Sequence, residues 1–424
     1  MNGGTVGHPT SGLHVAHFVQ RYPPAVGGSE AYFARLTDHL TACGDAVTVV
    51  TSTAVGLAEM WEGSRRPAEI VGPVRRFAPL TFPGRRYVLK AASLLPVRRW
   101  QCLTAPCNPV CPAMWRAAGR FDGPLDAVHA TAFPYSFPVA CGLRLARRHG
   151  VPFFLTPFLH TGDPDDPNDR TRRQYTRPHL RWLLRQADRV FVQTHLERDT
   201  AVSIGAPPER VVVQGLGVDP AECTGGDRAA ARAAWGVDDE VVVGHLANAS
   251  VEKGTVDLLS AAARLWDAGK AFRVVLAGPE MPNFLAFWER FPHRNRVRTL
   301  GPITDAQKRD FFAGIDAFAL PSRSDSFGLV LLEAWANAKP NLVYRAGGPA
   351  ELVRDGIDGL QARCGAIAGL ADQLGRLVGD ERLREWLGTV GRERVGAEFR
   401  WADKLALVRH EMLAGRRKPA GRSG

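Results

Sequence analysis

Short apolar runs alternate with amphipathic helical stretches along most of the chain, and this alternation constrains the fold more than any other feature. Strands that are buried on both faces of a parallel sheet appear as such runs, rich in β-branched residues. Between them, Phe33, Leu36 and Leu40 follow the spacing of a buried helix face. The runs cover residues 14–20, 45–52, 126–131, 152–157, 188–194 and 210–214 in the first half, and 240–248, 272–278, 296–301, 316–322 and 341–346 in the second. Repeated strand–helix units predict doubly wound parallel sheets, an α/β fold.

The two rounds of alternation predict two Rossmann-like domains that face each other across a cleft. The 424 residues are too many for one core and suit two domains of roughly 200 residues each. We expect the first domain over residues 1–218 and the second over residues 219–398, joined near Gly217-Val218-Asp219-Pro220. A last helix over residues 399–415 is expected to pack back on the first domain, and a tail over residues 416–424 to be disordered.

Composition excludes several classes of protein. Hydrophobic residues make up 45% and charged residues 23%, which is unlike a disordered, collagen-like or coiled-coil chain. No stretch approaches the roughly 18 uncharged apolar residues of a membrane span, and the first residues do not resemble a signal peptide, so we expect a cytoplasmic protein. The odd count of seven cysteines argues against a disulfide framework. The gaps between Cys102, Cys107 and Cys111 match no common metal-binding spacing, so we expect no metal site.

The positive charge is concentrated in the first half of the chain. The net charge is +11, and residues 1–219 contribute +8 of it, with 25 Lys and Arg against 17 Asp and Glu. Between Glu69 and Asp122 there are nine basic residues and no acidic one. This segment is either a solvated, loop-rich insertion or a surface for an anionic acceptor or for the inner face of an anionic membrane.

Four segments with glycine or charged residues follow predicted strands, at the edge where ligands bind in such folds. Each one alone also fits a plain turn, a solvated lysine or a helix cap. In the functional interpretation, Lys253 neutralises a phosphate, and the helix that starts after Asp325 offers N–H groups to a diphosphate. Glu333, expected two turns into that helix, then binds vicinal ribose hydroxyls. The segments are Gly27-Gly28-Ser29-Glu30, Glu252-Lys253-Gly254, Pro321 to Glu333 and Gly347-Gly348-Pro349-Ala350-Glu351.

Taken together and in this order, the segments resemble the retaining nucleotide-sugar glycosyltransferases of family 4, which have the two-domain GT-B fold. The resemblance also includes a segment with His160 and the linker Gly217-Val218-Asp219, and it covers nearly the whole chain. It implies that Lys253 binds the donor diphosphate and that Glu333 holds the ribose. Asp325 would contact hydroxyls of the transferred sugar, and His160 would lie near the reacting face of that sugar. Backbone groups of Ser326, Phe327, Gly328 and Leu329 would contact the donor, and Gly27 and Gly28 would line the cleft on the acceptor side.

The chain departs from the family pattern at two positions. Asp325 stands where the family usually has Glu, which keeps the carboxylate but shortens its reach by one methylene. Asn248 stands where the family often has Arg, so a hydrogen-bonding donor-site residue remains but its fixed charge is lost. Arg323 or another arginine could compensate for this loss, or His245 could mark a different local register.

The resemblance implies transfer of a sugar from a nucleoside diphosphate sugar, UDP before GDP, to a hydroxyl of a glycan, a lipid-linked intermediate or a secondary metabolite. It implies a same-face substitution that needs neither a metal nor another cofactor. Two alternatives stay open: a catalytically weak nucleotide-sugar-binding partner subunit, and an epimerase or hydrolase of the same fold. A nucleic-acid partner is not expected, because the charge excess lies in the acceptor half.

Overall fold

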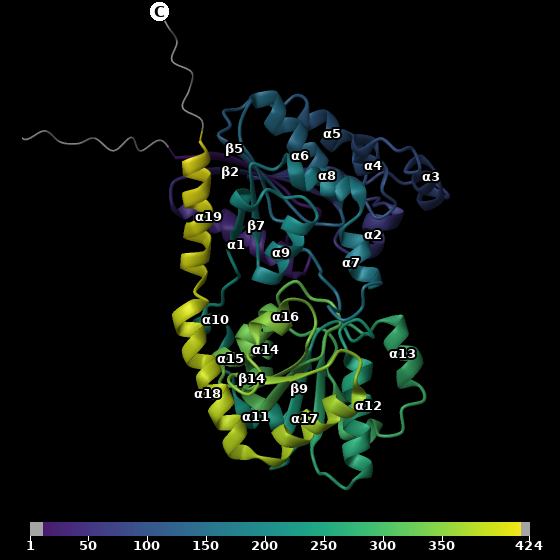
Figure 1. Ribbon diagram of the computed structural model, residues 1–424, viewed down its shortest axis with the longest axis vertical. Helices are drawn as coiled ribbons and strands as arrows, with labels where there is room; N and C mark the ends of the chain where they lie inside the picture. Colours follow the sequence, from purple (N-terminus) through teal and green to yellow (C-terminus); the bar gives the residue numbers. More distant parts are fainter. Residues whose placement is uncertain (1–11, 417–424) are drawn as a thin grey trace, which may run out of the picture.

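The computed structural model describes residues 12–416, and in it the apolar runs pair into two sheets, one in each half of the molecule (Figure 1). The first sheet has eight strands in the order β3-β4-β2-β1-β5-β6-β7-β8. All neighbours are parallel except β3 and β4, which are antiparallel. The strands are β1 (His14–Phe18), β2 (Ala46–Ser52), β3 (Glu69–Val71), β4 (Val74–Phe77), β5 (Ala127–Ala130), β6 (Phe153–Leu155), β7 (Arg189–Val192) and β8 (Val211–Val213). The six predicted strands are present, whereas β3 and β4 were not predicted.

The second sheet has six parallel strands in the order β11-β10-β9-β12-β13-β14. They are β9 (Val242–Leu246), β10 (Arg273–Ala277), β11 (Val297–Thr299), β12 (Ala317–Leu320), β13 (Asn341–Tyr344) and β14 (Gly359–Ala362). The five predicted strands are present, and β14 adds one edge strand. The predicted α/β fold of two facing Rossmann-like domains is confirmed.

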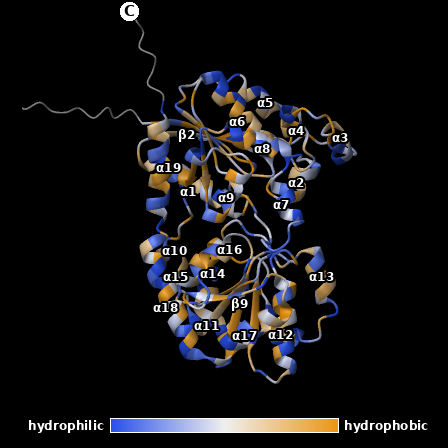
Figure 2. Ribbon diagram, in the orientation of Figure 1, coloured by the Kyte–Doolittle hydropathy of each residue, from blue (hydrophilic) through white to orange (hydrophobic). Residues whose placement is uncertain are grey.

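Helices cover both sheets, with the apolar strands at the centre of each half (Figure 2). In the first half these are α1 (Gly28–Ala42), α2 (Leu57–Glu62), α3 (Arg85–Ala92), α4 (Arg98–Thr104), α5 (Pro112–Ala118), α6 (Ser136–His149), α7 (Arg170–Tyr175), α8 (Pro178–Gln186), α9 (His195–Ser203) and the 3₁₀ helix η1 (Pro208–Arg210). In the second half they are α10 (Pro220–Cys223), α11 (Arg228–Trp235), α12 (Thr255–Asp267), α13 (Pro282–Trp288), η2 (Arg294–Arg296), α14 (Asp305–Gly314), α15 (Leu329–Ala336), α16 (Gly347–Leu352), α17 (Ile367–Gly379) and α18 (Glu381–Glu398). The last helix is α19 (Trp401–Gly415).

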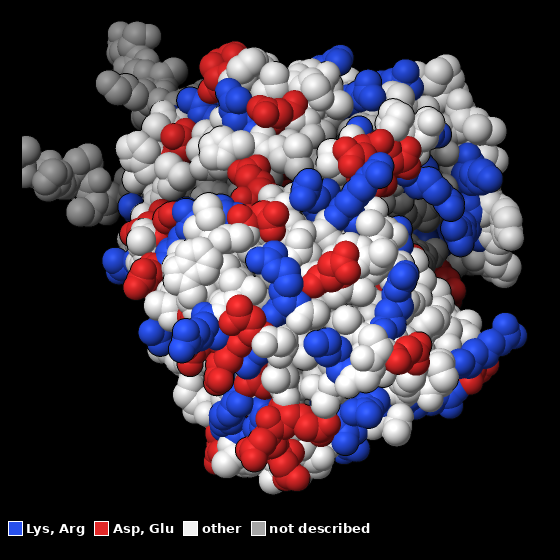
Figure 3. Space-filling model, turned by 60° about the horizontal axis from the view of Figure 1, so that its bottom comes forward, with Lys and Arg blue, Asp and Glu red and all other residues white. Residues whose placement is uncertain are grey.

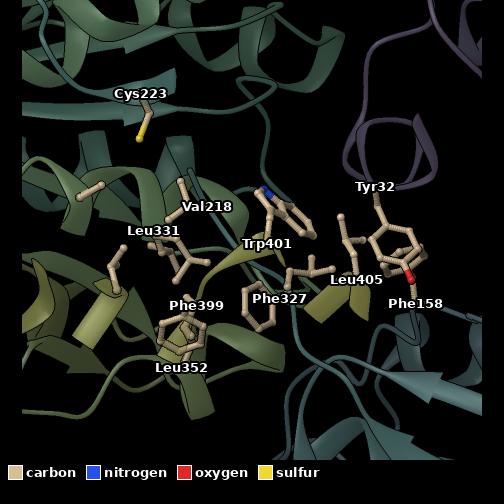
Figure 4. Close-up of a cluster of buried hydrophobic side chains, with 14 of the residues drawn as sticks. Tyr32, Phe158, Val218, Cys223, Phe327, Leu331, Leu352, Phe399, Trp401 and Leu405 are labelled. Carbon is tan, nitrogen blue, oxygen red and sulfur yellow. The ribbon is translucent and has the colours of Figure 1, made fainter. Parts of the chain in front are cut away.

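The chain passes between the two halves twice, and the two crossings lie side by side. The N–H of Val218 donates to the carbonyl of Phe399 at 2.8 Å, and Val218 forms a parallel bridge with Arg400. Figure 4 shows the apolar side chains of this junction, where Trp401 lies between Tyr32 of α1 on one side and Phe399 on the other. The two halves therefore share a hydrophobic cluster at the crossing. The predicted domain boundaries at residues 219 and 399 remain predictions.

The last helix crosses back to the first half, as predicted (Figure 1). Arg409 of α19 pairs with the buried Asp45 at 2.7 Å, and Glu411 pairs with Arg189 at 3.0 Å. Arg416, which we assigned to a disordered tail, instead pairs with Asp126 at 2.8 Å, because α19 ends beside that carboxylate. Residues 417–424 of the predicted tail lie outside the described residues. Among residues 12–416, no helix combines the length and the apolar character needed to cross a bilayer.

Candidate active site

The carboxyl ends of the strands in the two halves face each other, and the motif residues lie in the loops that follow these strands. Lys253 follows β9, Asp325 follows β12, and Gly347 follows β13, in the second half. In the first half, Gly28 follows β1 and His160 follows β6. The helices that begin at these loops, α1, α12, α15 and α16, have no side-chain cap. By contrast, α9, α11 and α14 are capped by Thr or Asp side chains. The first N–H groups of the uncapped helices are thus not engaged by a capping side chain.

Lys253 and Asp325 form an ion pair at the centre of the second half's loops, with 2.7 Å between Nζ and Oδ2. Burial alone would raise the pKa of Asp325. The Lys253 ammonium, His160 and the N–H of Ser326 outweigh it and hold the pKa below its ordinary value. Asp325 is therefore a carboxylate at neutral pH, and Lys253 has a negative partner that an incoming phosphate could replace.

Close backbone packing holds the two loops of this ion pair together. Gly254 has φ +74°, and a Cβ on it would lie 1.9 Å from the carbonyl oxygen of Pro321. The N–H of Arg323 donates to the carbonyl of Glu252 at 2.9 Å. Only glycine allows both the left-handed conformation and this approach. The position of Lys253 is thus fixed by the next residue in the chain.

The glycine pair Gly347-Gly348 supports the same loop from the other side. A Cβ on Gly347 would lie 2.4 Å from the carbonyl oxygen of Asp325, and one on Gly348 would lie 2.1 Å from that of Ser326. The N–H of Gly348 donates to the carbonyl of Asp325 at 2.8 Å. These glycines let two backbone segments touch, and thereby position Asp325.

Helix α15 begins at Leu329, with Gly328 as its N-cap residue at φ +93°. The side chain of Phe327 is buried in the hydrophobic cluster of the junction, so only its backbone can face a ligand. Glu333 lies one turn into α15, and the prediction of two turns was wrong because the helix starts after Gly328 and not at Ser326.

Glu333 pairs with Lys308 of α14 at 2.7 Å. Burial raises the pKa of the Glu333 carboxyl above its ordinary value, although the Lys308 ammonium opposes this shift. Lys308 was not singled out from the sequence, since it lies 25 residues from Glu333 in an ordinary amphipathic helix.

His160 reaches from the first half to the Asp325 loop. Its Nδ1 lies 3.1 Å from both the carbonyl oxygen and Oγ of Ser324. Burial lowers the pKa of His160 to about 4, so the ring is neutral at pH 7. A carbonyl oxygen can only accept, which places the proton on Nδ1 and leaves Nε2 as an acceptor. The ring also stacks on Tyr175, with 4.6 Å between ring centroids.

The first glycine motif belongs to the first half, whereas Lys253 belongs to the second. A Cβ on Gly27 would collide with the Glu30 carboxylate, which pairs with Arg21 at 2.7 Å. Nothing lies within 4 Å of the corresponding position on Gly28. Gly27 thus leaves room for the Glu30 carboxylate and its pair with Arg21, and the space next to the Cα of Gly28 is unoccupied by protein atoms.

Comparisons with known proteins give the family. A family model described as "Glycosyl transferase 4-like domain" matches residues 27–217, and one described as "Glycosyl transferases group 1" matches residues 227–394. A D-inositol 3-phosphate glycosyltransferase from Actinosynnema mirum is 30% identical over 293 residues, which are 64% of this chain and 69% of that protein. The chain belongs to the family 4-like glycosyltransferases.

Other similar proteins agree with this assignment for parts of the chain or for its fold. A glycosyltransferase of the same description from Mycobacterium sp. (strain KMS) is 39% identical over 181 residues, and the match spans 41% of each chain. The chain thus spans less than half the length of that relative. Anabaena HepE in complex with UDP and glucose has a TM-score of 0.72 at 18% identity, covering 95% of this chain and 100% of that one. Sucrose-phosphate synthase from Thermosynechococcus elongatus has a TM-score of 0.71 at 19% identity, covering 95% and 99%. These two likenesses give the GT-B fold.

One of the two departures from the family pattern, Asn248, lies on the surface of the second half. Asn248 is exposed in the loop after β9. His245 is buried within β9, where its Nδ1 donates to the carbonyl of Ala319 at 2.8 Å and its Nε2 accepts from Thr255 at 2.9 Å. His245 is therefore structural and does not mark a shifted register. Arg323 pairs with Asp257, so its charge is already matched within the protein.

His129 has a similar structural role. It is fully buried in β5, and its Nε2 lies 2.7 Å from Oγ1 of Thr156. All seven cysteines are free. Within residues 12–416, no group of three or more His, Cys, Asp or Glu side chains is arranged to hold a metal ion.

Two carboxylates lie at the start of α9. Glu197 was not singled out from the sequence, and Glu351 was named there only as the end of the fourth segment, without a role. The buried Glu197 accepts from the N–H of Leu159 and of Gln193, each at 2.6 Å, and so holds the segment that carries His160. Glu351 comes from the second half and accepts from the N–H of His195 at 2.8 Å and of Leu196 at 2.7 Å. Glu351 therefore joins the two halves next to the cleft.

We expect Glu351→Ala to lower the rate of sugar transfer about tenfold, while UDP affinity stays within twofold. The variant removes charge-assisted hydrogen bonds between the two halves, worth about 1.5 kcal/mol or more, and leaves the loops of Lys253 and Glu333 in place. Transfer rate and UDP titration measure the two quantities separately. The exposed Glu385→Ala is the matched control. An equal loss of UDP affinity and of rate would show that Glu351 supports the donor loops and not the contact between the halves.

Proposed function

We propose that the protein transfers a sugar from a nucleoside diphosphate sugar, UDP before GDP, to an acceptor hydroxyl with retention of the anomeric configuration. The observation that carries this proposal is the Lys253–Asp325 ion pair at 2.7 Å, with His160 of the facing half 3.1 Å from the adjacent Ser324. A cation, a carboxylate and a neutral imidazole thus lie together where the carboxyl ends of the strands in the two sheets face each other. The relatives that are named D-inositol 3-phosphate glycosyltransferases and the UDP-bound structural neighbour are consistent with it.

In this proposal, donor binding replaces the Lys253–Asp325 pair. The diphosphate takes the Lys253 ammonium as its counterion, and Asp325 then accepts hydrogen bonds from hydroxyls of the sugar. Ser326, Gly328 and Leu329 offer backbone groups at the uncapped start of α15, and Phe327 contributes its backbone alone. The positive charge from Lys253 and these N–H groups stabilises the leaving diphosphate, so the reaction needs no metal.

We propose a same-face substitution for the chemical step. The bond between the anomeric carbon and the diphosphate oxygen breaks, and the acceptor oxygen attacks from the same side. An oxygen of the departing diphosphate takes the proton of the acceptor hydroxyl. His160 lies beside this reaction with Nε2 as an acceptor for a sugar hydroxyl. Gly27 and Gly28 line the side from which the acceptor enters, and the contact between the halves excludes water.

The experiment is a panel of UDP-glucose, UDP-N-acetylglucosamine and GDP-mannose against acceptors that include an inositol phosphate, a lipid-linked sugar and a free glycan. Nucleotide release that depends on the acceptor supports transfer. Release without acceptor would indicate a hydrolase, and conversion of the donor sugar without release would indicate an epimerase. Asn248 in place of the usual arginine favours one further candidate, a partner subunit, which would bind nucleotide sugar without turnover.

We expect Glu333→Ala to weaken UDP binding roughly 10- to 150-fold, because it removes hydrogen bonds from the ribose to a charged group, worth about 1.5–3 kcal/mol. Titration calorimetry with UDP measures the change. The exposed Glu289→Ala is the control. Unchanged UDP affinity in Glu333→Ala would remove Glu333 from the donor site.

A further inference from the structure

Exposed apolar side chains gather on one part of the first half. Among residues 12–416, fifteen large hydrophobic side chains are exposed, and six of them lie within residues 87–100. These six are Tyr87 (79% exposed), Val88, Leu94 (77%), Leu95, Val97 and Trp100. We call the surface formed by residues 86–100 of α3, α4 and their link the α3–α4 surface. Such a concentration of exposed apolar side chains on a protein surface marks an interaction site.

The α3–α4 surface lies at the edge of the molecule, away from the junction of the two halves (Figures 1 and 2). All residues from 94 to 100 are exposed in succession. In α3 itself, only Arg85 and Leu89 are buried. The apolar side chains of the link thus point away from the protein core.

Buried contacts at the base of α3 hold this arrangement. The Arg85 guanidinium is buried and donates to the carbonyls of Met60, Trp61 and Asn108. Within the surface, Nε1 of Trp100 donates to the carbonyl of Ala92 at 2.9 Å, which ties α4 to the end of α3. These contacts therefore hold α3 and α4 in place beneath the exposed side chains.

The same surface is positively charged. Arg86, Lys90, Arg98 and Arg99 are exposed on it, and the chain has no acidic residue between Glu69 and Asp122. Helix α2, which contacts α3, adds the exposed Glu62. Figure 3 shows Lys and Arg side chains gathered along one edge of the first half, beside the hollow between the two halves. Cations thus alternate with apolar side chains over residues 86–100.

We propose that the α3–α4 surface docks on an anionic lipid bilayer, with its apolar side chains inserted at the interface and its four cations bound to lipid headgroups. Amphipathic helices with basic and aromatic residues bind such interfaces. The centre of a protein interface is depleted of charged residues, whereas here four cations stand among the apolar side chains and no acidic residue lies between Glu69 and Asp122. The proposal goes beyond donor binding and does not depend on it.

The test is co-sedimentation of the full chain with vesicles of phosphatidylcholine alone and of phosphatidylcholine with one third phosphatidylglycerol. We expect binding to the anionic vesicles that weakens with salt, and little binding to the neutral ones. Arg98→Gln with Arg99→Gln should weaken binding about thirtyfold, at about 1 kcal/mol for each cation. Leu94→Asp with Leu95→Asp should weaken it at least about tenfold.

Two controls separate this proposal from folding and from the donor site. Leu413→Asp changes an exposed leucine on α19 and should leave vesicle binding unchanged. UDP titration of each variant should match the unmodified protein, so failure of vesicle binding and failure of nucleotide binding are distinct results. Equal binding to neutral and anionic vesicles, or equal binding by all variants, would overturn the proposal. So would a dimer in solution that Leu94→Asp abolishes, because a second copy would then cover the surface.

Discussion

Replacing Lys253 by alanine is expected to lower kcat/KM for sugar transfer about 10³-fold. The variant removes the ammonium that is expected to stabilise the departing diphosphate, and losing one such preorganised group costs about 10²–10³ in rate. It also leaves Asp325 without its partner at 2.7 Å, so that a carboxylate faces the diphosphate unopposed. Initial rates of nucleotide release at varied donor concentration measure the loss.

Two further variants sharpen this test of Lys253. Lys253→Arg keeps the charge but changes its geometry, and we expect an intermediate rate. Lys270→Ala, at an exposed position just beyond α12, should match the unmodified protein. A Lys253→Ala rate within threefold of the unmodified protein would place the diphosphate elsewhere in the cleft.

The second large effect is expected for Gly254→Ala, which should lower the free energy of unfolding by about 2–5 kcal/mol and abolish measurable transfer. Alanine at φ +74° costs about 1–2 kcal/mol. Overpacking against the Pro321 carbonyl, 1.9 Å from the new Cβ, adds about 1–3 kcal/mol. The loop of Lys253 must then move away from the loop of Asp325.

Gly269 provides the matched control for this substitution. It ends the same helix that Gly254 begins, and it has a similar φ of +80°, but nothing lies within 4 Å of its Cβ position. Gly269→Ala should therefore cost only the conformational part, about 1–2 kcal/mol, and leave transfer intact. Chemical denaturation of both variants measures the difference. Equal destabilisation would show that backbone conformation, and not contact between the loops, requires glycine at position 254.

The sequence predicted the fold well, because strands buried on both faces leave continuous apolar runs such as those of β1 and β9. Strands β3 and β14 were missed because they do not leave such apolar runs. Strand β3 is exposed along its whole length and lies in an Arg-rich segment, so it left no such run. Strand β14, with the sequence GLQA, has no β-branched residue.

The candidate site was predicted in its chemistry but not in its pairings. Motif order placed Lys253, Asp325 and His160 at strand ends, yet Lys253 and Asp325 are 72 residues apart, and His160 and Ser324 are 164 apart. No local pattern reports such contacts. The sequence predicted Gly347 and Gly348 only as a glycine pair between a strand and a helix, whereas the fold uses them to position the Asp325 loop. That use depends on two backbones meeting, which becomes visible only in three dimensions.

Titration calorimetry of uridine and UDP tests the central claim most directly, namely that Lys253 and Glu333 bind the two ends of a nucleoside diphosphate. The account predicts that the unmodified protein binds UDP more tightly than uridine. The Lys253→Ala variant should bind UDP no more tightly than uridine, whereas Glu333→Ala should lower the affinity for both ligands. UDP binding that neither substitution changes would contradict the account.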